Sequence, residues 1–272
     1  MIREPAFAKL NLVLHVGRKR PDGLHPLCSV FASLELADTV EVETTEAGCD
    51  SVDCPGVPGP NLAAEAVTAF RARVPSLPSL RIRIDKRIPV AAGLGGGSAD
   101  AAAALRAANR IAGQPRTTEE LRVLAAALGS DVPSQNEPGH ALVSGVGEIV
   151  EPVRLPPYPV VLVPQARGLS TPDVYAQLDR TDGGRERLDP EPLRDFIRSP
   201  DPAAVENDLQ PAAIALRPEL TGVLDELRAQ GALAVLVSGS GPTCFGLFAD
   251  SDGARRAGRQ IDGAIVTALR RA

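Results

Sequence analysis

The chain has 272 residues, of which 44% are hydrophobic and 23% charged, and its formal net charge at pH 7 is −5. This is the composition of an ordinary globular protein. The excess of acidic residues argues against nucleic acid as the main partner. No stretch approaches the roughly 18 consecutive apolar residues of a membrane span. Four cysteines without a Cys-x-x-Cys pair, three histidines and an N-terminus that begins no signal peptide argue against a disulfide scaffold, a structural zinc site and secretion, so we expect reduced thiols in a cytoplasmic protein.

The first third of the chain is predicted to be rich in strands. The four strand-like segments are residues 8–16, 30–36, 39–44 and 80–86. The two middle strands are expected to pair with each other across a turn at Ala37-Asp38. Asn61 is placed to cap a helix over residues 62–73.

The glycine-rich run from Ile88 to Asp100 is the most informative segment of the chain. Four of the five residues 93–97 are glycine, and an alanine-rich segment that predicts a helix follows. We expect Ser98 to be the N-cap of that helix and Asp100 to lie in its first turn. A strand, a glycine loop and a helix N-terminus together present backbone N–H groups to an anion, most often phosphate.

The glycine run fits neither of the two common phosphate-binding templates. No lysine follows the glycines, as a Walker loop requires, and Ser98 stands where the dinucleotide fingerprint has its third glycine. A glycine-rich turn that binds nothing is the alternative, although three consecutive glycines carry an entropic cost that a structural reason must offset.

The rest of the chain alternates helices and strands irregularly. Helices are predicted over 118–128 with Thr117 or Thr118 as cap, as a pair after a loop at 180–190, over 219–230 and over 251–269. Strands are predicted on both sides of Gly145-Val146-Gly147 and over 160–163, 233–237 and 244–248. The proline-rich segment 155–159 is the candidate junction between domains 1–155 and 156–272. This order favours an α+β fold.

Three residues that could take part in catalysis or binding each have an ordinary structural explanation. Lys9 could extend from an edge strand, Asp131 could stabilise its own turn before Pro133, and His25 could be a turn residue. Taken one at a time, these residues leave the function open.

Eight segments in order along nearly the whole chain carry a resemblance to one family. They are residues 8–12, 17–27, 88–100, 129–133, 145–148, 170–175, 206–209 and 238–246. They resemble the motifs of the diphosphocytidyl-methylerythritol kinases, which belong to the GHMP kinase superfamily of small-molecule kinases. The resemblance implies a two-domain fold: an N-terminal domain like the second domain of ribosomal protein S5, a C-terminal ferredoxin-like α/β domain, and an active site between them.

The resemblance also implies an activity and a role for particular residues. The expected reaction is ATP-dependent phosphorylation of the 2-hydroxyl of 4-diphosphocytidyl-2-C-methyl-D-erythritol, with Mg²⁺ carried by the nucleotide and no metal ligand set of the protein's own. Asp131 would be the general base and Lys9 its neighbour, while Asn11, His25, Tyr175 and Thr171 would bind the substrate. The ATP-binding residues would be Pro89, Val90, Ala91, Ala92, Gly93, Leu94, Gly95, Gly96, Gly97, Ser98 and Ala99 around the phosphates, with Asn61 near the adenine. The protein is expected to be a monomer or a weak homodimer.

The chain departs from the family pattern at three places. Leu24 stands where the family usually has a tyrosine, and Ala99 replaces the family's common second serine. The two residues after Asp131-Val132-Pro133 are usually apolar in the family, and here Ser134-Gln135-Asn136-Glu137 is polar. A homoserine or mevalonate kinase of the same superfamily is the nearest alternative, and His25 with Tyr175 argues for a nucleobase instead. A non-catalytic nucleotide-binding regulator would not need both Lys9 and Asp131, and an RNA-binding protein is disfavoured by the acidic charge.

Overall fold

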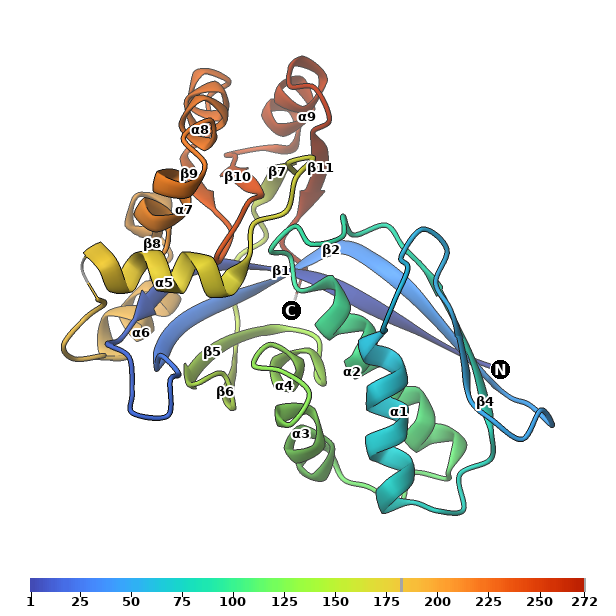
Figure 1. The fold of residues 1–272 in the computed structure, drawn as a ribbon. Coiled ribbons are helices and arrows are strands. Elements are labelled where there is room, and N and C mark those ends of the chain that lie inside the picture. The colour runs from blue at the N-terminus through green and yellow to red at the C-terminus, as the bar shows by residue number, and fades with distance from the viewer. Residues whose placement is uncertain (182, 272) are drawn as a thin grey trace. The chain divides into compact units, whose positions relative to one another are not determined.

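A computed structural model describes residues 1–181 and 183–271 of the chain. Its strands, drawn as arrows in Figure 1, are β1 (Ile2–Val16), β2 (Leu27–Thr44), β3 (Ser51–Asp53), β4 (Leu80–Asp85), β5 (His140–Gly145), β6 (Ile149–Val153), β7 (Pro159–Val163), β8 (Glu206–Asn207), β9 (Ala234–Val237), β10 (Cys244–Leu247) and β11 (Ile265–Ala268). Its helices are α1 (Leu62–Arg73), α2 (Gly96–Ile111), α3 (Thr118–Ala126), α4 (Val132–Gln135), α5 (Thr171–Thr181), α6 (Glu191–Arg198), α7 (Gln210–Leu216), α8 (Leu220–Ala229) and α9 (Ser251–Gln260), with a 3₁₀ turn η1 (Pro202–Ala204). The irregular order of helices and strands confirms the predicted α+β class.

Packing divides the chain into two compact units. The first consists of residues 1–8, 36–90 and 95–138, and the second of residues 9–35, 91–94 and 139–272. Strands β1 and β2 therefore contribute residues to both units. Each unit is built from several separate segments of the chain. The predicted boundary at residue 155 divides the chain into two continuous segments, and it stays a prediction.

In the first unit, β4 pairs in parallel with β3 and antiparallel with the second half of β2. Its alternating sequence explains the strand, because Leu80, Ile82 and Ile84 are fully buried while the residues between them are exposed. Helices α1 and α2 lie side by side over this core (Figure 1). The alanines at 101–104 keep α2 thin enough for α1 to pack directly against it.

Two strand predictions in the N-terminal region were wrong. β1 begins at Ile2 instead of residue 8, and the expected hairpin at Ala37-Asp38 is absent from the described structure because β2 runs unbroken from Leu27 to Thr44. Asp38 is buried in this strand, and its Oδ1 accepts hydrogen bonds from the backbone N–H groups of Arg87 (2.5 Å) and Ile88 (2.8 Å). Aspartate is common in turns, but Asp38 instead bonds the backbone of residues about 50 positions away.

The helix caps of the first unit follow from local sequence. Asn61 caps α1 as predicted, its side chain accepting from the backbone N–H of Ala63 at 2.9 Å. Thr117 caps α3 in a capping box with Glu120. α3 ends at Ala126, two residues earlier than predicted, and the short helix α4 follows where only a turn was expected.

In the second unit, the first half of β2 pairs with β5, β5 pairs with β6, and the end of β1 pairs in parallel with β8. A separate four-stranded sheet has the order β11-β7-β10-β9, and α8 and α9 pack against it. The short strands β5 and β6 around 145–147, the strand β7, the helices α6 and α7 after the 180–190 loop, and α8 confirm the predictions for this region.

The C-terminal prediction was partly wrong. The helix expected over 251–269 ends at Gln260, and residues 265–268 form β11 instead, with Ile265 opposite Leu162 of β7. Ile265, Val266 and Thr267 are β-branched, which favours a strand, and β7 provides the partner. α5 over Thr171–Thr181 was not predicted.

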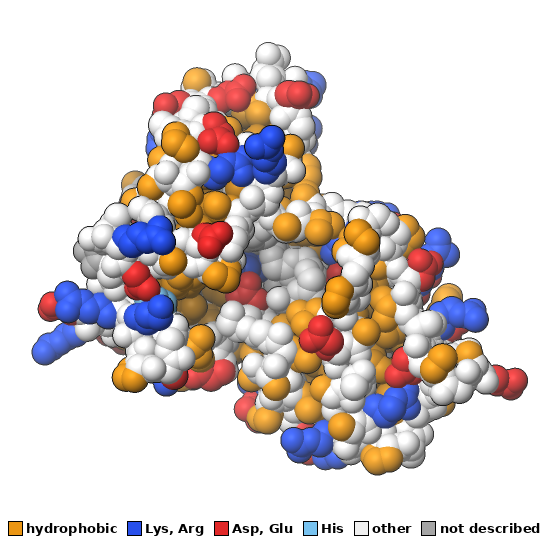
Figure 2. Space-filling model, in the orientation of Figure 1, with side chains coloured by type: hydrophobic (Ala, Val, Ile, Leu, Met, Phe, Trp, Pro, Cys, Tyr) orange, Lys and Arg blue, Asp and Glu red, His pale blue; other side chains and the backbone are white. Residues whose placement is uncertain are grey.

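The surface in Figure 2 carries acidic and basic side chains interspersed over the face shown. In the described part of the chain, every helix is too short or too polar to span a bilayer. Cys28, Cys49, Cys54 and Cys244 are free thiols, of which Cys49 is exposed.

Candidate active site

The glycine run joins β4 to α2, and the helix starts earlier than predicted. Gly95 is the N-cap, with a left-handed backbone at φ 70°, and no side chain caps the helix. Ser98 is therefore the third helical residue and not the cap. Asp100 lies beyond the first turn and is buried, which corrects its predicted place as well.

The N-terminus of α2 presents backbone without side chains. The first N–H groups of a helix have no acceptor within the helix, and here they belong to small residues. A Cβ at Gly96 would lie 3.0 Å from Cγ2 of Ile88 and 3.3 Å from Nζ of Lys86, whereas a Cβ at Gly97 would meet nothing within 4 Å. One side of this turn is therefore packed on the protein and the other is open to a ligand.

A buried charge cluster made of Asp38, Lys86 and Asp100 lies beneath this turn. Lys86 Nζ donates to Asp38 Oδ2 at 2.5 Å and to Asp100 Oδ2 at 2.8 Å. Burial raises the pKa of Asp100 to about 7, although the nearby Lys86 charge opposes that rise. Burial works against the charge of Lys86 too, but the two carboxylates together raise its pKa. Lys86 thus stays an ammonium close to the helix N-terminus.

In the second unit, β1 places Lys9 and Asn11 on one face, because side chains two residues apart on a strand point the same way. Lys9 Nζ donates to Asn11 Oδ1 at 2.9 Å, and Asn11 Nδ2 donates to Ser29 Oγ at 2.9 Å. The Lys9 ammonium also lies 4.5 Å from the centroid of the Phe31 ring. Lys9 is 6% exposed, so it is a buried, oriented ammonium and not a surface lysine.

The middle of the glycine run is held by two other segments of the second unit. The backbone N–H of Lys9 donates to Leu94 O at 3.0 Å, and Ser238 Oγ donates to Gly93 O at 3.1 Å. A Cβ at Gly93 would lie 2.6 Å from Gly241 O and 2.8 Å from Ser238 O. Only glycine allows the turn 238–243 to approach this closely.

The two residues predicted to bind a nucleobase lie together. The rings of His25 and Tyr175 are tilted by 45° with centroids 5.0 Å apart. Nδ1 of His25 is 2.9 Å from Gly17 O, and Nε2 lies 3.3 Å from Oδ1 of Asp179 without the alignment of a hydrogen bond. Leu24, at the position of the family tyrosine, is 52% exposed.

Thr171 opens α5 and links it to the turn 238–243. Its Oγ1 is 2.8 Å from Ser240 Oγ. The predicted substrate residue and a residue of the turn that holds Gly93 therefore share one hydrogen bond.

Asn61 and Asp131 belong to the first unit. Asn61 caps α1, which is the structural role predicted from its position; a contact with adenine stays a prediction. Asp131 is half-buried immediately before α4, and its backbone oxygen accepts from Ser134 Oγ at 2.9 Å. Lys9 belongs to the second unit, so the pairing of Lys9 with Asp131 also stays a prediction.

The polar segment after Asp131 is buried from Ser134 to Asn136, whereas Glu137 is exposed. Asn136 Nδ2 donates to Thr118 O at 3.3 Å, and the backbone oxygen of Gln135 accepts from Arg106 at 2.8 Å. The side chains of Ser134 and Asn136 therefore have hydrogen-bond acceptors, whereas the contact of Gln135 with α2 is made by its backbone. Ala99 is likewise 1% exposed and packed in the core, which explains a small apolar residue there.

Comparison with known proteins identifies the family. Models described as GHMP kinases N terminal domain and GHMP kinases C terminal match residues 61–143 and 188–265. A 4-diphosphocytidyl-2-C-methyl-D-erythritol kinase of Anaeromyxobacter sp. (strain Fw109-5) is 43% identical over 96% of this chain and 87% of its own. One of Paracoccus denitrificans (strain Pd 1222) is 44% identical over 96% and 92%. A crystal structure of 4-(cytidine 5'-diphospho)-2C-methyl-D-erythritol kinase matches with a TM-score of 0.85 at 35% identity, covering 98% of this chain and 99% of that one. The chain belongs to this family of GHMP kinases.

The two-domain GHMP kinase fold predicted from the motifs is therefore confirmed. Two features that contact the glycine run were not predicted from the sequence. One is the turn 238–243, whose motif was recognised without a role. The other is the buried charge cluster, whose members come from three separate segments. The alternating pattern of residues 80–86 predicts Lys86 at the end of a strand. The sequence does not predict that Asp38 and Asp100 pair with it.

Proposed function

We propose that this chain transfers the γ-phosphoryl group of ATP to the 2-hydroxyl of 4-diphosphocytidyl-2-C-methyl-D-erythritol, a step of the methylerythritol phosphate route to isoprenoid precursors. The observation that carries the proposal is the grouping of Lys9, Asn11 and residues 92–94 in one unit of a chain from this family. A buried ammonium beside a glycine-rich phosphate loop suits a reaction that builds negative charge on phosphate and on an alcohol oxygen.

The glycine run would bind the phosphates of ATP through its backbone. Residues 89–99 would wrap the triphosphate, with the N–H groups at the start of α2 and the open face of Gly97 directed to it. Lys86 also lies beneath the same turn, where its charge is balanced by Asp38 and Asp100. Asn61 would lie near the adenine.

The acceptor hydroxyl would meet Lys9 and Asp131. Asp131 would take the proton of the 2-hydroxyl, Lys9 would stabilise the charge that develops on its oxygen, and Asn11 would orient the same end of the substrate. Mg²⁺ carried by the ATP would neutralise charge on the β- and γ-phosphates, and Ser98 offers the hard hydroxyl oxygen that such an ion accepts.

The cytidine end would bind at His25 and Tyr175. In the neutral form whose Nδ1–H donates to Gly17 O, Nε2 of His25 is an acceptor, which suits the exocyclic amino group of cytosine. Tyr175 would stack on the base, and Thr171 would bind nearby. The contact of the two rings supports a nucleobase ligand over homoserine or mevalonate.

The test is ATP consumption measured in parallel with the cytidyl substrate, homoserine and mevalonate. Turnover with the cytidyl substrate alone is expected; turnover only with the other two would refute the substrate assignment. Asp131→Asn should lower kcat by about 10²-fold to 10⁴-fold. Asp53→Asn, which removes an exposed carboxylate on β3, is the control and should retain activity. Wild-type turnover by Asp131→Asn would exclude it as the base.

We further infer a cytoplasmic protein that acts as a monomer or a weak homodimer. Sedimentation of the purified protein across a range of concentrations tests the oligomeric state.

A further inference from the structure

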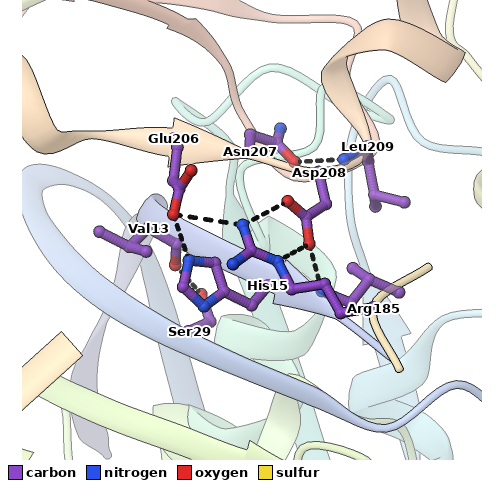
Figure 3. Close-up of polar contacts among 9 residues, drawn as sticks. Val13, His15, Ser29, Arg185, Glu206, Asn207, Asp208 and Leu209 are labelled. Carbon is purple, nitrogen blue, oxygen red and sulfur yellow. Dashed lines mark hydrogen bonds and ion pairs between the residues drawn. The ribbon is translucent and has the colours of Figure 1, made fainter. Parts of the chain in front are cut away.

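The motif at residues 206–209 has no part in the function proposed above, yet it is tightly bound to β1 (Figure 3). Asn207 lies opposite Leu14 in the parallel pair of β8 and β1. The next residue, Asp208, donates its N–H to Leu14 O at 3.0 Å and accepts from the N–H of Val16 at 2.9 Å. Its carboxylate also accepts two hydrogen bonds from Arg185, at 2.7 and 2.8 Å.

The preceding residue anchors the other end of this short strand. Glu206 contacts the buried ring of His15, a residue of β1, and its Oε1 lies 3.2 Å from Nη2 of Arg185. Figure 3 shows the guanidinium of Arg185 between the two carboxylates. Asn207 is therefore fixed to β1, the strand that also carries Lys9.

The side chain of Asn207 points away from this network to a different segment. It is 6% exposed, and its Nδ2 donates to Val237 O and to Gly239 O, both at 2.8 Å. Its Oδ1 accepts from the N–H of Leu209 at 2.9 Å. Two carbonyl acceptors on one side and an N–H donor on the other fix the orientation of the amide.

The two carbonyls that Asn207 holds flank Ser238, the residue that donates to Gly93 O. Gly239 has a left-handed backbone at φ +56°, and a Cβ placed there would lie 3.1 Å from Oδ1 of Asn11. The segment held by Asn207 therefore touches both the phosphate loop and the side chain that orients the acceptor.

We propose that Asn207 is a positioning residue for phosphoryl transfer: its amide ties the turn 238–243 to β1, so that Gly93 and the Lys9–Asn11 pair keep a fixed spacing. This inference rests on the proposed function for its chemistry. A loop displaced by about 1 Å can cost about 10²-fold in rate, because the phosphoryl group and the acceptor must be aligned.

The test compares Asn207→Ala with a matched control, Asn109→Ala. Asn109 is also a buried asparagine, 7% exposed, and its amide also spans a turn: Nδ2 donates to Arg116 O at 2.9 Å, and Oδ1 accepts from the N–H of Arg116 at 3.1 Å. Both substitutions should lower Tm. Asn207→Ala alone should lower kcat/KM for ATP, by about 10-fold to 10²-fold, and weaken binding of ADP measured by calorimetry, with KM for the alcohol changed less than threefold.

A second variant keeps the proposal testable if Asn207→Ala does not fold. Asn207→Asp keeps the shape of the side chain and its acceptor for Leu209 but removes both donated hydrogen bonds, and it should show the same loss for ATP. Ser238→Ala should lower kcat/KM for ATP by a smaller factor. In the double variant Asn207→Ala/Ser238→Ala, kcat/KM should fall by less than the product of the two single factors.

The inference is overturned if Asn207→Ala and Asn207→Asp affect ATP kinetics and ADP binding no more than Asn109→Ala does at a comparable loss of Tm. If the wild-type protein fails to phosphorylate the cytidyl substrate, the proposed function falls, and ADP binding by the same variants still decides the role of Asn207.

Discussion

Replacing Asp100 with asparagine removes one carboxylate from the buried charge cluster while preserving the shape of the side chain. The cluster holds two carboxylates and one ammonium, so it carries a net negative charge when all three groups are ionised. Asp100 is 3% exposed, and its Oδ1 has no hydrogen-bond partner. Asparagine at this position leaves Lys86 paired with Asp38 alone.

The sign of the effect follows from the raised pKa of Asp100. Burial moves this pKa from 3.8 to about 7, so the folded protein holds a proton that the unfolded chain releases. The stabilisation from Asp100 is complete below pH 3.8 and is lost as pH rises through about 7. Linkage over that interval gives a loss of about 3 kcal/mol in the free energy of unfolding between pH 5 and pH 8.

The assay is urea unfolding followed by circular dichroism at pH 5, 6, 7 and 8. The free energy of unfolding of Asp100→Asn relative to the wild type should rise by about 3 kcal/mol across this range. Asp85→Asn, which removes an exposed carboxylate from β4, is the control. Parallel profiles for wild type and Asp100→Asn would refute the reasoning, and an equal effect of Asp85→Asn would assign it to overall charge.

Three further predictions concern the glycine run, the proposed nucleobase site and a helix cap. Gly93→Ala should lower kcat/KM for ATP by at least about 10²-fold, because its Cβ would lie 2.6 Å from Gly241 O; Gly97→Ala, where a Cβ meets nothing within 4 Å, should keep the wild-type Tm. Leu24→Tyr should lower KM for the cytidyl substrate several-fold in steady-state assays, by adding a second stacking ring. Asn61→Ala should cost about 1 kcal/mol in urea unfolding, because it leaves an N–H of α1 without its cap.

The features that sequence predicts well here are those set by neighbouring residues. Asn61 and Thr117 are caps because their side chains bond N–H groups two and three residues away, and both helix starts were predicted. The same holds for β4, whose alternation sets which side chains are buried. The family motifs added Lys9 and Asn11, and the structure places these two in direct contact.

The wrong predictions have partners that are distant in sequence. Asp38 looks like a turn residue, but its carboxylate bonds Lys86, Arg87 and Ile88, which are 48 to 50 residues away. Residues 265–268 were assigned to the last helix although three of them are β-branched, and in the structure they pair with β7. The difference in free energy between helix and strand that local propensity sets is smaller than the free energy that such distant contacts contribute. The contacts of Asn207 could not be predicted for the same reason, since its acceptors are 30 and 32 residues away.

The glycine run shows that one motif can satisfy several separate physical requirements. Gly93 is needed because the turn 238–243 packs against its Cα, and Gly95 because the helix N-cap has a positive φ. At Gly96 a Cβ would crowd Ile88, while Gly97 faces open space. A sequence template scores the four positions alike, yet a methyl group at each would affect something different: the close contact with the turn 238–243, the start of α2, the packing against Ile88, or the open side of the turn. Each of the four glycines therefore has its own physical reason, although they lie within five consecutive residues of the chain.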